Sequence, residues 1–220
     1  MINESHREIM AGEKSLQSGG INEKTSDKEG NPMLRVSAAL LAIVLFGITG
    51  ISFAGDWTGN INAFMGMKTL SDDWADEFQE QTEGGILFDL QKRDWPVCGV
   101  IESMYSMKDD VIDGVDLELI TTEILLGVGK NWAPNSTIRP YVRAGIVFAT
   151  TELNGSNGSQ SESISESGNG YGISGGVYWT ISQHFNLGLG VRYTKAVIDF
   201  DGLDQECGGT HSGLVIGYHW

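Results

Sequence analysis

The chain has 220 residues, among them 30 glycines and two cysteines, and its 29 acidic against 14 basic side chains give a net charge of −15. This charge argues against non-specific nucleic-acid binding, and two cysteines outside any Cys-x-x-Cys pair argue against a disulfide framework or structural zinc. A glycine-rich, acidic chain with no collagen repeat is expected to form an all-β fold.

The N-terminal part has the features of an export signal. Residues 1–32 lack an apolar run and are expected to be disordered, because they cannot bury enough surface to offset their conformational entropy. Residues 33–54 begin with Met33 and a basic residue, continue as an apolar run and end in small residues, which predicts a signal peptide cleaved after Ala54. The run is shorter than the roughly twenty residues of a membrane-spanning helix, which disfavours the alternative of a helical anchor.

The start of translation has two alternatives. A signal peptide lies at the N-terminus of its precursor, so Met33 is the expected start, with residues 1–32 an artefact of start-codon choice; Met1 is the alternative. Residues 55–220 contain no apolar run long enough for a transmembrane helix. We therefore expect an exported protein that is secreted, periplasmic or an outer-membrane barrel.

Alternation of apolar and polar residues predicts eight strands in this exported part. They lie at about 57–68, 83–92, 96–107, 115–130, 139–150, 170–181, 185–198 and 209–220. The seventh is typical, because Phe185, Leu187, Leu189, Val191 and Tyr193 alternate with Asn186, Gly188, Gly190 and Arg192. The apolar face ends in aromatic residues and the other face carries glycine and polar groups, which favours lipid outside and a narrow lumen inside. Leu125, on the inner face, departs from this pattern.

The connections alternate in length, as in bacterial outer-membrane barrels. Those at 92–95, 131–138 and 182–184 are short and are assigned to the periplasm; those at 69–82, 107–114, 151–169 and 199–208 are mostly longer and polar, and are assigned to the outside. An even number of strands closes the sheet, so no unpaired edge meets lipid.

The C-terminal comb of Leu214, Ile216, Tyr218 and Trp220, with the glycine-rich segments 171–181 and 185–193, carries a family resemblance. The chain resembles the small eight-stranded outer-membrane barrels typified by outer membrane proteins X and A, also described as porin-like or opacity-type. The resemblance implies an eight-stranded antiparallel up-and-down transmembrane β-barrel that is monomeric and in contact with outer-membrane lipid and lipopolysaccharide. It also implies that the comb is the signal for the barrel-assembly machinery, with Trp220 where the family usually has Phe.

Five charged residues fall on the inner face: Asp89, Glu102, Glu123, Arg143 and Arg192. Isolated charges in a confined lumen are costly, so pairing into a salt-bridge plug is expected. The alternatives are a selectivity constriction in a narrow pore and a catalytic carboxylate pair.

An enzymatic site is not expected, although lipid A deacylases and palmitoyltransferases share this fold. His211 and Ser212 are adjacent and therefore point to opposite faces, while His184 lies in a turn and His219 at a strand end, so we expect no Ser-His-acid geometry. No metal site or cofactor is expected either, because the acidic loop at 199–208 lacks EF-hand spacing. The acidic loops have two interpretations: they are simply solvated, or they bind divalent ions weakly and bridge through them to lipopolysaccharide.

The sequence thus predicts a non-enzymatic integral outer-membrane protein with a structural or surface-interaction role through long acidic extracellular loops. The alternatives are a small passive porin-like channel and a lipid A-modifying enzyme. Two free thiols are also predicted, since Cys98 falls near the periplasmic rim and Cys207 at the outer rim, where it would be accessible.

Overall fold

The computed structural model describes residues 56–71, 74, 78–112, 114–132, 136–157, 161–182, 184–200 and 203–220. The chain divides into two units, Met1–Ala54 and Gly55–Trp220, and every described residue belongs to the second. The predicted extension and signal peptide lie outside the described residues and stay predictions. Within the described part of the chain, no helix has the length and apolar character needed to span a bilayer.

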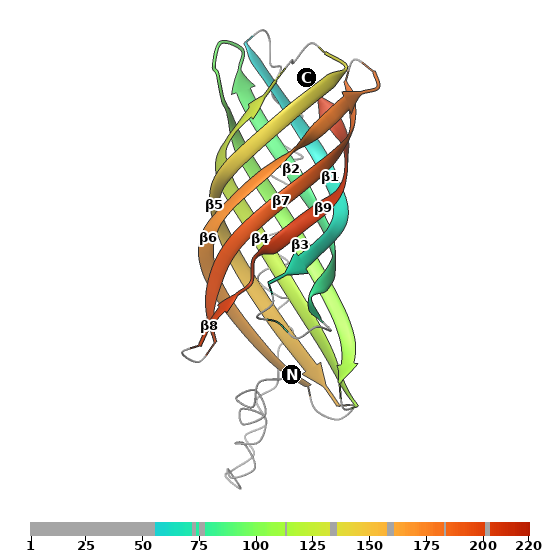
Figure 1. Cartoon of the computed structure of the whole chain (residues 1–220), viewed down its shortest axis with the longest axis vertical. Helices are drawn as coiled ribbons and strands as arrows, with labels where there is room; N and C mark the ends of the chain where they lie inside the picture. Colours follow the sequence, from blue (N-terminus) through green and yellow to red (C-terminus); the bar gives the residue numbers. More distant parts are fainter. Residues whose placement is uncertain are drawn as a thin grey trace, which may run out of the picture. The chain divides into compact units, whose positions relative to one another are not determined.

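Nine strands make up the described fold (Figure 1). They are β1 (Trp57–Leu70), β2 (Glu80–Lys92), β3 (Cys98–Ile112), β4 (Val115–Asn131), β5 (Ile138–Ser156), β6 (Ser161–Thr180), β7 (Phe185–Phe200), β8 (Leu203–Glu206) and β9 (Gly209–His219). Each strand from β1 to β7 pairs antiparallel with the next, β7 pairs with β9, and β9 pairs with β1. The sheet is therefore closed.

The ring contains eight strands because β8 and β9 are two parts of one. Both pair with β7 in a single register, with Val197 opposite Glu206 on β8 and Thr194 opposite Gly209 on β9. The ladder is interrupted at 207–208, although the Cys207 amide still donates to the Ala196 carbonyl at 2.9 Å. The predicted eight-stranded up-and-down antiparallel barrel is confirmed.

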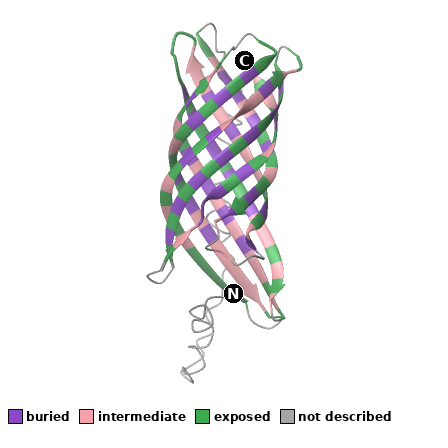
Figure 2. Cartoon of the chain, viewed as in Figure 1, coloured by how far each residue is buried: buried purple, intermediate pink, exposed green. Residues whose placement is uncertain are grey.

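Side chains alternate between the interior and the outer surface along the strands (Figure 2). The outward direction predicted for the apolar residues is correct: Leu189 is 51% exposed, whereas Arg192 on the other face is buried. Leu125 is also buried, as expected from its inner position. Local alternation was sufficient to assign the faces because a strand reverses side-chain direction at every residue.

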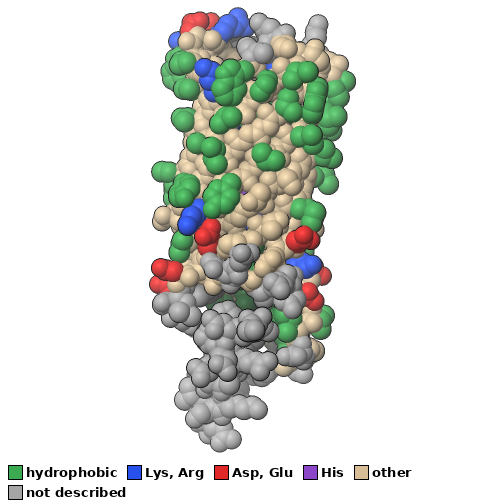
Figure 3. All heavy atoms as spheres, viewed as in Figure 1, with side chains coloured by type: hydrophobic (Ala, Val, Ile, Leu, Met, Phe, Trp, Pro, Cys, Tyr) green, Lys and Arg blue, Asp and Glu red, His purple; other side chains and the backbone are tan. Residues whose placement is uncertain are grey.

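An apolar belt covers the outside of the barrel. Exposed aromatic residues lie at the end near the C-terminus (Trp57, Trp95, Trp132, Trp179 and Tyr218) and toward the opposite end (Tyr105, Phe148, Tyr171 and Tyr193). Eight residues separate Trp179 from Tyr171 on β6, which at the usual rise and tilt gives a belt about 20 Å high. On the face shown in Figure 3, charged side chains gather above and below this belt. These are the features of a surface that meets the apolar core of a membrane.

Two of the predicted outer loops are in fact strands. The pairing of β3 with β4 continues to Ile112 and Val115, and that of β5 with β6 to Ser156 and Ser161, so the loops predicted at 107–114 and 151–169 are wrong. The loops predicted at 69–82 and 199–208 are also shortened, since β1 reaches Leu70, β2 begins at Glu80, and β7 pairs with β8. Beyond the belt the outward-facing residues are mostly polar, whereas Leu117, Leu119 and Leu153 pack on the inner face, so the lipid-facing apolar alternation ends although the main-chain pairing continues.

The two long hairpins form a sheet that projects past the rest of the barrel. Pairing of β2 with β3 ends at Met107, and pairing of β6 with β7 ends at Asn169. The strand segments 108–112, 115–120, 151–156 and 161–168 lie beyond these points, and we call them the projecting sheet. At the two edges of this sheet, the projecting segment of β3 pairs only with β4 and that of β6 only with β5 among the described residues.

Candidate functional site

Arg143 is the centre of the ion-pair network in the half of the lumen near the C-terminus. Its Nη2 donates to Asp89 Oδ2 at 2.6 Å and to the Tyr178 hydroxyl at 2.7 Å, and its Nη1 donates to Glu102 Oε1 at 3.1 Å. The guanidinium carbon also lies 4.6 Å from the centre of the Tyr141 ring. A charge with two carboxylate partners and an aromatic face is well compensated for its burial.

Glu123 has the corresponding position in the other half. Lys68 Nζ donates to its Oε1 at 2.6 Å, and Arg192 Nη2 lies 3.0 Å from its Oε2. Arg192 Nε lies 3.6 Å from Glu102 Oε2, which links the two halves. The five inner charges named from the sequence are thus brought together in one network, and all are buried.

Three members of this network were missed by the sequence reasoning: Lys68, Glu83 and His211. Each lies on the inward face of its strand and is buried, so the strand alternation could have identified it. His211 Nδ1 lies 2.8 Å from Glu83 Oε1, and its Nε2 lies 3.0 Å from Thr194 Oγ1. Ser212, as predicted, points outward and takes no part.

The Glu83, His211 and Thr194 contacts have the order of a hydrolytic triad, namely carboxylate, imidazole and hydroxyl. The sequence analysis expected no such geometry, since it compared His211 with Ser212 alone. All three side chains are buried, and the Thr194 hydroxyl also lies 3.4 Å from Glu123 Oε1. A nucleophile needs room for an acyl carbon beside it, and here charged side chains fill that position. The arrangement is a structural hydrogen-bond chain.

Among the described residues, buried side chains occupy the lumen at several levels. A buried cluster of Phe64, Leu87, Met104, Tyr141, Tyr178 and Val215 contains two tyrosine rings stacked 4.5 Å apart. The hollow beside Glu102 and Arg192 measures about 10 Å³, which holds no more than one water molecule. Toward the projecting sheet, Leu70, Phe78 and Leu119 form a second cluster against Trp74, whose indole N–H donates to the Glu206 carbonyl at 2.6 Å.

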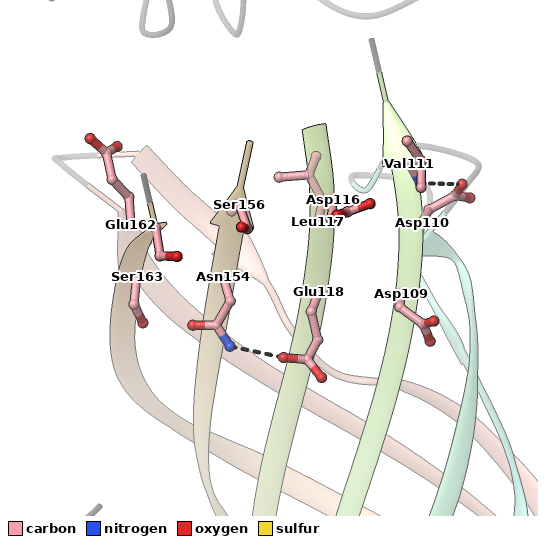
Figure 4. Close-up of a pocket in the computed structure, with 12 residues that line it drawn as sticks. Asp109, Asp110, Val111, Asp116, Leu117, Glu118, Asn154, Ser156, Glu162 and Ser163 are labelled. Atoms are coloured by element: carbon pink, nitrogen blue, oxygen red, sulfur yellow. Dashed lines mark hydrogen bonds between the residues drawn. The ribbon is translucent and has the colours of Figure 1, made fainter. Parts of the chain in front are cut away.

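The projecting sheet carries a hollow of about 680 Å³ (Figure 4). The five carboxylates that line it are those of Asp109, Asp110, Asp116, Glu118 and Glu162. The lining residues include no lysine or arginine. Asp109 and Glu118 are directly opposite on β3 and β4, and Glu118 Oε2 accepts a hydrogen bond from Asn154 Nδ2 at 3.2 Å. Like charges in opposition cost stability, so this surface is not optimised for folding alone.

The two most acidic loops of the sequence, at 69–82 and 199–208, contribute no residue to this hollow. Most of their carboxylates fall outside the described residues. The projecting sheet was not singled out, because all of it except 115–120, which was predicted as strand, was assigned to loops. In the described ranges, no group of three or more His, Cys, Asp or Glu side chains is placed to hold a metal ion.

The C-terminal comb lies on the outer surface. Leu214, Ile216 and Tyr218 are exposed, and the Trp220 ring lies 6.2 Å from that of Phe88. The Trp220 main-chain carbonyl accepts a hydrogen bond from Thr58 Oγ1 at 2.6 Å. In the closed barrel the last residue is therefore held against the first strand.

Both cysteines are free and both are buried. The accessibility predicted for Cys207 is wrong, since its side chain is 0% exposed and its Sγ lies 3.5 Å from the Ala196 carbonyl oxygen. Position along the chain placed Cys207 near the rim, but the register of β8 and β9 on β7 turns it inward.

Comparisons with known proteins agree with this architecture. A profile of the outer membrane protein β-barrel domain matches residues 38–219. No curated protein sequence matches the chain. Among solved structures, the attachment invasion locus protein Ail of Yersinia pestis, in complex with the heparin analogue sucrose octasulfate, is similar with a TM-score of 0.55 at 12% identity, over 76% of this chain and 100% of that one.

Two further barrels are similar at lower scores. Neisserial surface protein A has a TM-score of 0.44 at 13% identity, over 74% of this chain and 94% of that one. The N-terminal barrel domain of Pseudomonas aeruginosa OprF has a TM-score of 0.43 at 16% identity, over 74% and 97%.

Proposed function

Because the chain belongs to the outer membrane protein β-barrel family, we propose that it is a non-enzymatic surface protein that binds partners through its projecting sheet. The observation that carries this proposal is the acidic hollow on that sheet, beyond the apolar belt. In this proposal the barrel anchors the sheet in the outer membrane, and the filled lumen serves stability.

The contents of the lumen support a structural role for the interior. Charged side chains are paired across it, and the hollow beside Glu102 and Arg192 measures only about 10 Å³. Conductance recordings of the purified full chain in planar bilayers test the alternative function of a passive channel. Discrete conductance steps would support the channel and contradict a purely structural lumen.

The charge of the hollow determines the chemistry of the partner that we propose. Five carboxylates attract a cationic ligand, such as a lysine- or arginine-rich segment of a protein, and repel a polyanion. The partner seen with Ail, sucrose octasulfate, is a polyanion. We propose the opposite preference for this chain.

Binding of a fluorescent oligolysine to the barrel in nanodiscs tests the proposal. Neutralising the hollow with Asp109→Asn, Asp116→Asn and Glu118→Gln is expected to weaken binding on the order of tenfold at low ionic strength, with the difference shrinking as salt is added. The matched control is Asp204→Asn, an exposed carboxylate outside the hollow, which is expected to have little effect. Equal affinity of the neutralised and parent proteins would contradict the proposal.

We also propose that Leu214, Ile216, Tyr218 and Trp220 are the signal for the barrel-assembly machinery. Their outward direction supports this, since the comb offers an apolar edge before the barrel closes. Deleting 218–220 is expected to leave export intact and to abolish assembly, with the protein degraded in the periplasm. Heat-modifiable gel migration of the membrane fraction measures this, and a normally migrating truncated form would refute it.

A further inference from the structure

The charges of the lumen are segregated between two groups of strands. The buried carboxylates Glu83, Asp89, Glu102 and Glu123 lie on β2, β3 and β4, whereas the basic side chains Lys68, Arg143, Arg192 and His211 lie on β1, β5, β7 and β9. Every interior ion pair of the described residues joins two strands that are not hydrogen-bonded neighbours. These contacts therefore form only when the sheet has curled.

The ladder between β1 and β9, which we call the seam, is where the first and last strands meet. Lys68 on β1 and His211 on β9 are Cα partners across it, and Arg192 on β7 is the partner of His211 on its other side. Three basic side chains thus lie in one row on adjacent strands. Lys68 and Arg192 carry positive charge on the two sides of the His211 imidazole, and like charges gathered in one row weaken a sheet, so this row works against closure unless it is compensated.

The next pair of lumen-facing residues along the seam contributes little to holding β1 and β9 together. It consists of Gly66 and Gly213, which have no side chains to pack across the ladder. The glycines are required there, because a Cβ on Gly66 would lie 2.1 Å from the Ser212 carbonyl oxygen. The strands approach closely at this level but are held by main-chain bonds alone.

Glu123, from β4 on the opposite wall, compensates the row. Its Oε1 accepts from Lys68 Nζ at 2.6 Å and lies 3.8 Å from His211 Nε2, while its Oε2 lies 3.0 Å from Arg192 Nη2. One carboxylate therefore contacts side chains from β1, β9 and β7. No other carboxylate of the described residues contacts basic side chains on both sides of the seam.

We propose that Glu123 holds the seam of the barrel closed. Without its charge, Lys68, His211 and Arg192 would lie side by side, with Glu83 near His211 and Glu102 near Arg192 but no carboxylate on Lys68 among the ion pairs of the described residues. The seam would then open more readily than the other ladders. This inference depends on the fold and the lumen contacts and is independent of the surface function proposed above.

Hydrogen exchange of the full-length protein in lipid nanodiscs tests it. Glu123→Gln keeps the shape and removes the charge, and is expected to accelerate exchange of the seam amides in the paired segments 63–67 and 212–216 by about tenfold or more. The control Glu102→Gln removes a carboxylate whose partners, Arg143, Ser174 and Arg192, lie off the seam strands. It is expected to leave seam exchange much less affected. Equal acceleration of all ladders by Glu123→Gln, or none, would overturn the proposal.

A rescue experiment covers the case in which Glu123→Gln does not fold. Met65 and Leu214 are outward-facing Cα partners across the seam, so a Met65→Cys, Leu214→Cys disulfide would fasten it. In a background with both native cysteines replaced by alanine, this bridge is expected to restore heat-modifiable migration to Glu123→Gln. A bridge between Phe88→Cys and Ile101→Cys, on β2 and β3, is expected not to. Rescue by both bridges, or by neither, would refute a role at the seam.

Discussion

Replacing Arg143 with leucine is expected to destabilise the barrel by about 3–5 kcal/mol, since it leaves two buried carboxylates without their shared cation. Asp89 would keep hydrogen bonds from Asn60 and Asn131, which do not neutralise its charge. Glu102 would keep only the longer contact with Arg192, at 3.6 Å, and the Ser174 hydroxyl. Urea unfolding in lipid vesicles, followed by tryptophan fluorescence, measures the loss.

A neutral combination distinguishes lost charge pairing from lost volume. Adding Asp89→Asn and Glu102→Gln to Arg143→Leu removes the unpaired charges but not the changed packing, so part of the stability is expected to return. An Arg143→Leu protein that unfolds at the same urea concentration as the parent would show that the network contributes nothing to stability.

Leu189→Arg is expected to cost about 2–4 kcal/mol, because it places a charge against the middle of the lipid. Leu189 is exposed on the outer face of β7, halfway between Phe185 and Tyr193, which lie at the two ends of the apolar belt. A conservative Leu189→Val should change little. Urea titration in vesicles again supplies the measurement.

The matched control is the same substitution at the edge of the belt. Phe185→Arg puts the charge where it can reach the interface, so the expected cost falls to about 0–1 kcal/mol. If the two arginine variants are equally stable, the depth assigned to these residues is incorrect.

The sequence by itself was enough to determine the membrane-spanning parts of the strands, their faces and the closed eight-stranded sheet. These follow from local rules: side chains reverse direction at each residue, as in 185–193, and lipid tolerates neither an open edge nor a polar outer face. For the same reason the five lumen charges, from Asp89 to Arg192, were assigned to the interior from their position in the alternation alone.

Only the tertiary structure decided which interior groups meet and what lies above the belt. Lys68 and Glu123 are 55 residues apart and Glu83 and His211 are 128 apart, and their contact depends on strand stagger around the ring, which the alternation does not encode. Most of the projecting sheet was missed because the outward faces of its strands are mostly polar, so the lipid-facing apolar alternation does not extend to them and main-chain pairing marks them instead. The burial of Cys207 likewise follows from the register on β7, a property of two strands together.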